Sequence, residues 1–460
     1  MSGATSLPVR LESLFGADHV LTAETQLSKY AIDGMPPRAV LRPASAEEVA
    51  EIVKVAAREE LAMIPCGSGS KLGIGMPPQR YDIALDMRGL QEIAHYDADD
   101  LTLSVDSGKL LGGVQMALRA KRQFLPLAVP CMEICTIGGT VASGIDSSLR
   151  QQYGTGRDFL IGAEFVDGTG RLCRSGGRVV KNVTGYDIHK LLIGSLGTLA
   201  VITRLNFRTF PLPEAHAGHL ATFSSLDAAL HYHAKVSQSG LPLSNLELFD
   251  SEYAAMAGRL FDAVNQNVSP LLKSNSWVVY SSCADNAIVV RRIVGDLERI
   301  ASSTNCANQA ALQEPANEEL QGLSQTAYQL LSTAAPCVAL LRIVLPQLHA
   351  STIAEILRTA ETPWLHSAFV VRACNVAYLA LLAEKEDEPT IAVLSRSVSS
   401  IFSAVSVAAG SAAVLHAPAA LKRTMNLWGP SRPDFALMQR VKAAFDPQNI
   451  FAPGRFVGGI

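Results

Sequence analysis

The sequence predicts an α+β fold with more than one domain, and three observations support this. A chain of 460 residues is too long for a single hydrophobic core. The first part of the chain alternates helical and strand patterns around dense glycine turns, whereas the glycine density falls sharply beyond Pro211 and Pro213. Strand and helix patterns then alternate again, which predicts a second domain with an antiparallel sheet covered on one face. We therefore expect domains over residues 1–211 and 212–425, followed by a C-terminal segment over 426–460.

The elements of the first domain follow in order from their side-chain patterns. Ser45 and Glu48 form a capping box, and apolar residues from Val49 to Ala57 recur at helical spacing, which predicts a helix there. A short strand over 62–64 runs directly into a glycine turn. Further strands are expected over 83–87, 91–96 and 101–106, a helix over 110–122, and strands over 163–166, 172–174 and 199–207.

The second domain is predicted from the same kinds of pattern. Strands are expected over 218–223, 246–249, 277–282 and 338–344, and helices over 226–237, 287–301 and 351–359. The Asn- and Gln-rich stretch 305–317 is expected to be a surface loop. Residues 401–421 carry no formal charge, but Gly410 and Pro418 divide them into a helix end, a turn and a strand, so no transmembrane segment is expected. The C-terminal segment is predicted to contain a helix over 438–445.

Composition excludes some classes of protein. The formal net charge of −3, from 39 basic and 42 acidic residues spread along the chain, offers no basic field for nucleic acid. The eight cysteines contain no Cys-x-x-Cys pair, so free thiols are expected and no metal site is predicted. The N-terminus lacks the charged and apolar regions of a secretory signal. A cytoplasmic location is therefore expected.

The most informative feature is the grouping of the glycines. Of 34 glycines, 21 lie between Gly67 and Gly197, clustered in turns at 64–71, 136–144 and 194–198. Glycine permits positive φ and lets a phosphate approach backbone N–H groups. The first turn lacks the third glycine of the Rossmann fingerprint, and no P-loop motif occurs. Two long glycine clusters are present, and a further glycine turn with a cation lies at 153–158. Together they suit the binding of a dinucleotide. The alternative is that they are unrelated tight turns at the surface.

Four blocks of sequence carry a resemblance to a known family. They are residues 65–71, 130–158 and 181–203, and the pair 445–447 with 453–455. In these blocks the chain resembles the flavoproteins whose FAD-binding domain is named after p-cresol methylhydroxylase (PCMH) and vanillyl-alcohol oxidase (VAO). The resemblance implies FAD as cofactor. It also implies an FAD-binding domain of two subdomains, an α+β cap domain with an antiparallel sheet, and a C-terminal tail that returns to the FAD domain.

The resemblance also implies where FAD would bind. Residues 65–71 would hold the pyrophosphate, residues 136–144 would run along the pyrophosphate, ribityl chain and ring, and residues 197–202 would lie by the adenine half. Lys181, Tyr186 and Asp187 would lie near the flavin side of the fold, although Lys181 could be only a surface charge and Asp187 only a helix cap. The residues expected to bind FAD are Pro65, Cys66, Gly67, Ser68, Gly69, Ser70, Lys71, Pro130, Thr136, Gly138, Gly139, Thr140, Ser143, Gly144, Arg157, Asp158, Lys181, Gly197, Thr198, Val201, Ile202 and Arg455.

Two departures from the catalytic members of this family narrow the expectation. Relatives that act on D-2-hydroxy acids usually carry Glu where this chain has Leu196, and they carry a His-x-Gly-Asp-Gly-Asn-x-His segment that is missing here. The nearest candidate is the lone His416, which is more often structural than a ligand. Both departures are similar to the FAD-binding E subunits of bacterial glycolate oxidases. That similarity implies a catalytic FAD subunit and an iron–sulfur subunit as partners, and a location on the inner face of the membrane through them.

The chemistry implied is two-electron oxidation of a small 2-hydroxy acid such as glycolate, which yields glyoxylate. Arg342 and Arg372, on predicted strands, are candidates for binding the substrate carboxylate. Arg455, Lys181 and Arg157 are candidates for a cation beside the flavin. No residue stands out for a covalent flavin bond, although Cys66 and Cys131 lie within the glycine blocks. The alternatives are a self-sufficient FAD-dependent dehydrogenase and a non-catalytic assembly subunit.

Overall fold

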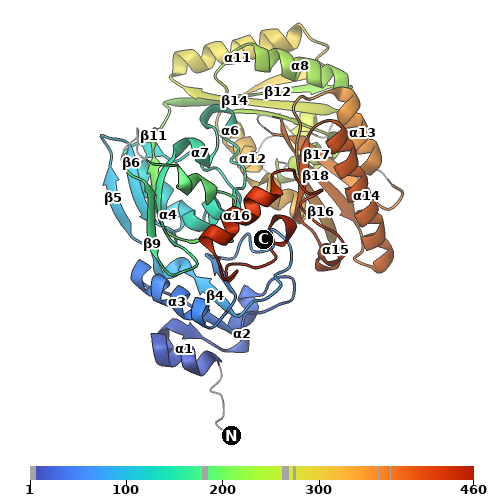
Figure 1. Cartoon of the computed structure of the whole chain (residues 1–460). Coiled ribbons are helices and arrows are strands. Elements are labelled where there is room, and N and C mark those ends of the chain that lie inside the picture. The colour runs from blue at the N-terminus through green and yellow to red at the C-terminus, as the bar shows by residue number, and fades with distance from the viewer. Residues whose placement is uncertain (1–6, 179–184, 262–268, 273–275, 361, 373–374) are drawn as a thin grey trace.

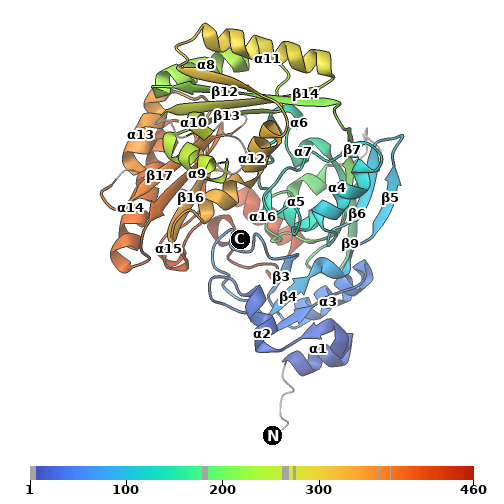
Figure 2. The same ribbon diagram turned by 180° about the vertical axis from the view of Figure 1, so that it is seen from behind.

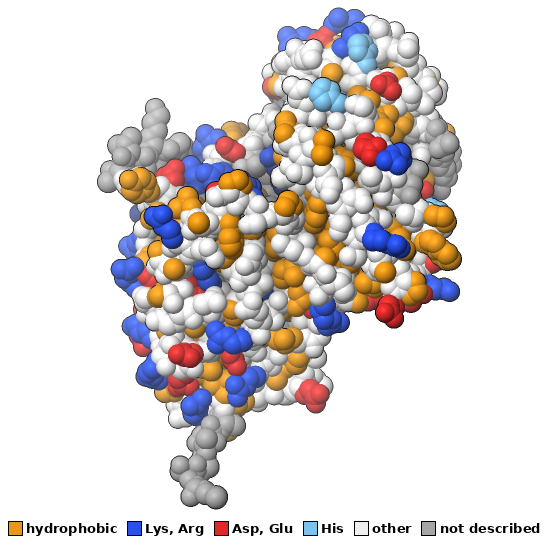
Figure 3. All heavy atoms as spheres, turned by 45° about the vertical axis from the view of Figure 1, so that its right-hand side comes forward, with side chains coloured by type: hydrophobic (Ala, Val, Ile, Leu, Met, Phe, Trp, Pro, Cys, Tyr) orange, Lys and Arg blue, Asp and Glu red, His pale blue; other side chains and the backbone are white. Residues whose placement is uncertain are grey.

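The computed structural model describes residues 7–178, 185–261, 269–272, 276–360, 362–372 and 375–460. Figure 1 shows an N-terminal domain of two small sheets beside a cap domain that is built on one large sheet. Figure 3 shows Lys and Arg most numerous at the lower left of the face that it draws, with Asp and Glu among them, and hydrophobic side chains scattered between the two lobes.

The first sheet of the N-terminal domain has the strand order β1-β2-β4-β3, in which β2, β4 and β3 run parallel. Its strands are β1 Val20–Leu21, β2 Ala39–Leu41, β3 Met63–Cys66 and β4 Ile83–Asp86, and its helices are α1 Leu7–Phe15, α2 Glu24–Leu27 and α3 Ala46–Arg58. The Ser45 side chain accepts the N–H of Glu48 at 3.1 Å, as predicted, but the capping box is not completed, because the Glu48 carboxylate accepts the N–H of Ala44 at 2.8 Å and not that of Ser45. Apolar side chains of α3 and α1 pack on the sheet in one core.

The second sheet is antiparallel, with the order β5-β6-β10-β8-β9. Its strands are β5 Ile93–Asp97, β6 Thr102–Asp106, β8 Leu160–Val166, β9 Leu172–Gly176 and β10 Val201–Arg208, and a separate pair is formed by β7 Gln123–Phe124 and β11 Phe210–Pro211. The helices of this part are α4 Leu111–Arg119, α5 Ile137–Ser143, α6 Arg150–Tyr153 and α7 Gly156–Phe159.

The second glycine cluster is mostly helix α5 rather than an extended turn. The Thr136 side chain caps the helix by accepting the N–H of Gly139 at 3.2 Å, and Gly144 ends it in the left-handed region with φ 61°. A helix rich in small residues is stable here because Ile137 and Val141 bury their side chains in the core of the second sheet.

The cap sheet has the order β15-β12-β14-β13-β17-β18-β16-β19, and its neighbouring strands pair antiparallel. Its strands are β12 Ala215–Phe223, β13 Asn245–Phe249, β14 Trp277–Asp285, β15 Asn308–Leu312, β16 Cys337–Val344, β17 His366–Val371, β18 Val376–Ala383 and β19 Ser411–His416. Helices α8 Leu226–Gln238, α11 Ala287–Ser302, α13 Ala350–Ala360, α14 Glu388–Val407 and α15 Ala419–Thr424 share one core. Helices α9 Ser251–Phe261, α10 Ser269–Leu272 and α12 Ala316–Ser332 share a second core, on the opposite face of the sheet. Figure 2 shows α9 and α12 on that face.

Two expectations for the cap domain were wrong. Both faces of its sheet are covered, because α9 and α12 bury apolar side chains against the face toward the N-terminal domain. The stretch 305–317 is not a loop: residues 308–312 form the edge strand β15, paired with β12, and α12 begins at Ala316. Asn and Gln are tolerated in β15 because an edge strand exposes much of its surface.

The uncharged stretch 401–421 divides as expected into the end of α14, strand β19 and the start of α15. Within the described ranges, α14 is the one helix with the length and hydropathy of a membrane span. Leu394, Val398 and Ile401 bury their side chains in the cap core. An apolar helix of this length also occurs in the core of a folded domain, so its composition alone does not indicate a membrane span.

The C-terminal segment returns to the N-terminal domain. Its helix α16, Phe435–Phe445, starts three residues earlier than predicted and crosses the front of the molecule in Figure 1. Beyond it, Met63 in β3 donates its N–H to Ile450 O at 2.7 Å and accepts the N–H of Ala452 at 2.9 Å. The segment therefore extends the first sheet beside the strand that leads into the first glycine turn.

Candidate functional site

Two adjoining cavities lie where the three glycine clusters meet. Both are lined by the end of β3, the first glycine turn and one face of α5. The expected residues that line them are Pro65, Cys66, Gly67, Ser68, Gly69, Ser70, Lys71, Thr136, Gly138, Gly139, Ser143, Gly197, Ile202 and Arg455. The structure thus brings together most of the residues that the sequence selected for FAD.

The first glycine turn offers unused backbone donors to this cleft. Within the part of the chain that the structure describes, the N–H groups of residues 67–71 donate no hydrogen bond to the protein. Gly69 has φ +83°, a conformation that disfavours any side chain there. The Lys71 ammonium reaches across to Pro130 O at 3.3 Å and therefore lies at the same cleft. Successive free N–H groups with a nearby cation form an anion-binding concavity.

Close packing of the turn against α5 shapes the cleft. A Cβ on Gly67 would lie 2.0 Å from Thr136 Oγ1, and one on Gly138 would lie 2.6 Å from Ser107 Cβ. Thr136 is itself held as the N-cap of α5. These two glycines are therefore required by space, and they allow a flat or extended ligand to lie against the backbone.

The third glycine turn closes one end of α5. The N–H of Gly194 donates to Val141 O at 2.9 Å, and the N–H of Leu196 donates to Ala142 O at 2.8 Å. Leu196 has φ 53°, which is uncommon for a branched side chain. Its side chain lines the cleft and packs against the cap core. The position of Leu196 is therefore an apolar contact between the two domains.

The charge of the cleft is positive. Arg455 and Lys71 line it, and none of the described residues that line it is acidic. Arg455 is 3% exposed, and its guanidinium donates to the carbonyls of Leu72 and Ile74. Burial lowers the pKa of Arg455 to about 10. A buried cation without a carboxylate hydrogen-bonded to it is costly, so an anionic ligand at this place would stabilise it.

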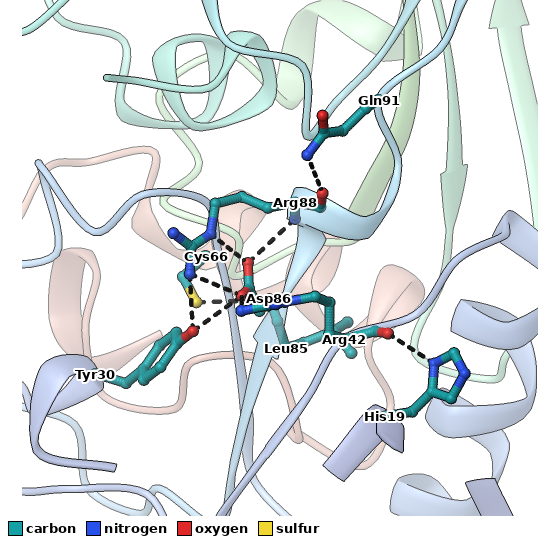
Figure 4. Close-up of polar contacts among 8 residues, drawn as sticks. All are labelled: His19, Tyr30, Arg42, Cys66, Leu85, Asp86, Arg88 and Gln91. Carbon is teal, nitrogen blue, oxygen red and sulfur yellow. Dashed lines mark hydrogen bonds and ion pairs between the residues drawn. The ribbon is translucent and has the colours of Figure 1, made fainter. Parts of the chain in front are cut away.

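A second charged network surrounds Asp86, which is paired in the sheet with Cys66 of the cleft lining (Figure 4). Asp86, fully buried at the end of β4, accepts Tyr30 Oη at 2.9 Å, Arg42 Nε at 2.8 Å and Arg88 Nε at 2.9 Å. Burial alone would raise the pKa of Asp86, but the hydrogen bonds from Arg88 lower it. Two arginines share one carboxylate, so the network adds a positive charge beside the cleft. The sequence did not reveal this network because Tyr30 and Arg42 come from other elements.

The thiol of Cys66 is unsuited to a covalent flavin bond. Burial raises its pKa well above the usual value, and Sγ donates to Leu85 O at 3.6 Å. A protonated thiol is a poor nucleophile.

Some expected residues lie outside the two cavities. Arg157 contacts Lys190 O, and Asp158 caps α7 in a capping box with Thr155. The Val201 side chain lies in the core between α3 and the first sheet, on the opposite side of β10 from Ile202. The expected roles of these residues in FAD binding stay predictions, as do those of Pro130, Thr140, Gly144 and Thr198. Lys181 lies outside the described residues.

Tyr186 and Asp187 also lie apart from the cleft. The Tyr186 side chain is 90% exposed, and Asp187 forms an ion pair with Lys190 at 2.8 Å. Asp187 stands at the cap position of the following helical turn, but its side chain makes no capping hydrogen bond there.

A polar row crosses the cap sheet on the face toward the N-terminal domain. Arg342 pairs with Tyr378 across β16 and β18, and both lie on the face that carries the second cap core. Arg342 binds Asp146 with Nε at 2.5 Å, which ties the cap to the residues just after α5. Burial alone would raise the pKa of Asp146, but the charges of Arg342 and Arg150 lower it.

Arg372 extends this row and is almost fully buried. Its Nε donates to Glu247 at 3.3 Å, and its Nη2 donates to Ser324 O at 2.6 Å. Three buried polar atoms around it have no partner among the described residues: Arg372 Nη1, Tyr253 Oη and Tyr378 Oη. Unsatisfied buried donors of this kind suit an oxygen-bearing ligand or water. His416 lies apart from this row, near Lys422 and Asp33, and burial lowers its pKa.

The comparisons with known proteins agree with this geometry. The family model for the FAD binding domain matches residues 37–176, and the model for the C-terminal domain of FAD linked oxidases matches residues 212–456. The chain belongs to the FAD-linked oxidases. Among solved structures, p-cresol methylhydroxylase with substrate bound is 17% identical, with a TM-score of 0.77 over 98% of this chain and 97% of that chain. The expected PCMH/VAO-type fold is therefore confirmed.

Three curated relatives of this FAD-linked oxidase are informative. Glycolate oxidase subunit GlcD of Bacillus subtilis is 30% identical over 48% of each chain, and subunit GlcE of Escherichia coli is 35% identical over 44% of this chain and 57% of that protein. The chain thus spans about half the length of these two relatives. D-lactate dehydrogenase of Archaeoglobus fulgidus is 26% identical over 91% of each chain.

The cleft fits the FAD that both family domains imply. The free N–H groups of the first turn, Lys71 and Arg455 would hold the pyrophosphate, and the small residues of α5 would lie along the rest of the cofactor. Bound FAD supplies two-electron redox chemistry, for which the protein provides binding and orientation. Among the described residues no group of three His, Cys, Asp or Glu side chains is placed to hold a metal.

Proposed function

We propose that this protein oxidises small 2-hydroxy acids with FAD and acts as the FAD-binding subunit of a glycolate oxidase or dehydrogenase complex. The observation that carries the proposal is the positive, carboxylate-free cleft beside a cap face that carries Arg342 and Arg372. The names of the relatives, which include glycolate oxidase subunits and a D-lactate dehydrogenase, support the substrate class.

Substrate recognition would fall to the polar row of the cap. A 2-hydroxy acid carries a carboxylate, for which a buried arginine with a free N–H is the best match. Arg372 has that free N–H in Nη1, whereas Arg342 gives both of its bonds to Asp146. We therefore favour Arg372 as the residue that binds the carboxylate. In the reaction the Cα hydrogen would leave with both bond electrons as a hydride to FAD while a base takes the hydroxyl proton, which leaves the 2-oxo acid.

The subunit role rests on the departures from the catalytic pattern. Leu196 occupies the position of a carboxylate in catalytic relatives, and His416 is not accompanied by the other ligands of a metal-binding segment. The partners would be a catalytic FAD subunit and an iron–sulfur subunit. The location proposed is the cytoplasm, with attachment to the inner face of the membrane through these partners.

The test is the visible spectrum of the purified chain under anaerobic conditions. A flavin band that stays unbleached with glycolate or D-lactate until the partner subunits are added would support the subunit role. Ethylene glycol, which has the hydroxyl of glycolate but no carboxylate, should bleach nothing in either case. A colourless protein that takes up no FAD on reconstitution would refute the proposal.

The second candidate is a self-sufficient FAD-dependent dehydrogenase. It is favoured by the D-lactate dehydrogenase of Archaeoglobus fulgidus, which matches over 91% of both chains. Bleaching by D-lactate or glycolate without any partner would establish it. In that case Arg372→Lys should raise KM for the acid much more than it lowers kcat, because binding of the carboxylate is lost.

A further inference from the structure

The loop directly after the first glycine turn is part of the N-terminal domain in sequence, but its side chains pack against the cap domain. We call residues 72–76 the coupling loop. Ile74 is 2% exposed and lies in the cap core that faces the N-terminal domain. Met76 packs against the other cap core, and its Sδ accepts the N–H of Leu427. The coupling loop is therefore inserted into the cap, one residue beyond the turn whose N–H groups face the FAD cleft.

Two buried cations hold the carbonyls of the coupling loop. Lys422, from α15 of the cap, donates to Gly73 O at 2.6 Å. Arg455, from the C-terminal segment, donates to the carbonyls of Leu72 and Ile74 and to Met76 O. These cations therefore fix the backbone of the coupling loop directly beside the turn whose N–H groups donate no hydrogen bond within the described part of the protein.

Lys422 is held in place from the N-terminal domain as well. Its ammonium lies 2.9 Å from Asp33 Oδ1, and the side chains are 2% and 10% exposed. Charges buried this deeply are tolerated only while they are paired. Undocking of the cap would separate Lys422 from both Asp33 and Gly73, so the position of the cap and the order of the loop are linked.

We propose that the coupling loop makes FAD affinity depend on docking of the cap, and that Lys422 is the positioning residue that transmits this dependence. Lys422 does not line the cleft, so it would act on FAD only through Gly73 and the turn. The proposal rests on FAD binding and not on any substrate or partner.

The experiment is titration of the apoprotein with FAD, followed by quenching of flavin fluorescence. Lys422→Met should raise the Kd for FAD about tenfold or more. In the apoprotein it should also speed hydrogen exchange of the amides of Ile74 and Met76, which are hydrogen-bonded in the docked loop. Asp33→Asn keeps the bond from Lys422 to Gly73 and should raise the Kd less than Lys422→Met does.

The matched control is Ile293→Ala, which loosens the cap under α11, where that helix packs on β12 and β14 and not on α15, outside the lining of the cleft. It should lower the thermal midpoint while leaving the Kd for FAD within about twofold. If Lys422→Met does not fold, Ile74→Ala tests the same link by removing the side chain that anchors the loop. An unchanged Kd in the folded Lys422→Met or Ile74→Ala protein, or an equal rise in Ile293→Ala, would overturn the proposal.

Discussion

Substitution of Gly67 by alanine tests whether the cleft is the FAD site. The new Cβ would lie 2.0 Å from Thr136 Oγ1, 2.7 Å from its Cγ2 and 2.9 Å from its Cβ, so the turn and α5 cannot both keep their positions. Overpacking of this kind costs about 1–3 kcal/mol, and loss of the Thr136 cap adds about 1 kcal/mol. If most of this free energy destabilises the FAD-bound arrangement of the turn and α5 relative to the apoprotein, the Kd for FAD should rise by about 10- to 1000-fold.

The assay is FAD titration of the apoprotein, with thermal unfolding measured in parallel. Gly177→Ala is the matched control, because a Cβ there meets no atom within 4 Å, the residue has no positive φ, and it does not line the cleft. It should bind FAD as the unmodified protein does. If Gly67→Ala retained unchanged FAD affinity, or if both variants lost affinity equally, the cleft would not be the pyrophosphate site.

Two further predictions concern carboxylates whose pKa values are shifted, Asp86 and Asp250. Asp86→Ala leaves Arg42 and Arg88 without their carboxylate. It should lower the free energy of unfolding in urea by about 2–4 kcal/mol, less than for a fully buried pair because both arginines are partly exposed to solvent. A loss below about 1 kcal/mol would contradict the role of this network. Burial raises the pKa of Asp250 to about 7, so its contribution to stability is full below the unfolded pKa and is lost as the pH rises from about 4 to about 7. Unfolding measured across that range should show a slope that Asp250→Asn removes; an equal slope in the variant would assign it to other groups.

The sequence predicted the elements whose signals are local. The helix at Ser45 was correct because its cap and its apolar face lie within one segment. The division of residues 401–421 was correct because Gly410 and Pro418 act on their own backbone. Strand β15 was missed because its Asn-rich sequence is fixed by pairing with β12, and α5 was missed because its glycines are held by the core beneath them.

The candidate site was predictable only where its residues are contiguous in the chain. The first glycine turn and the small residues of α5 were recognised because each motif lies within one block. The network around Asp86 and the bond from Lys422 to Gly73 join residues from separate segments, the latter pair 349 positions apart. Such contacts depend on the whole fold, and one sequence carries no local sign of them.

The return of the C-terminal segment has a consequence for biosynthesis. The loop that Arg455 clasps includes Leu72, which leaves the ribosome 383 residues earlier. At about 5–20 residues per second, the completed arrangement forms about 20–80 s after the first turn has been made. During that interval the nascent chain has strand β3 but neither Ile450 nor Ala452 beside it. Loading of FAD is therefore expected only after Arg455 has been made, and bound FAD would identify only those molecules that have been translated at least that far.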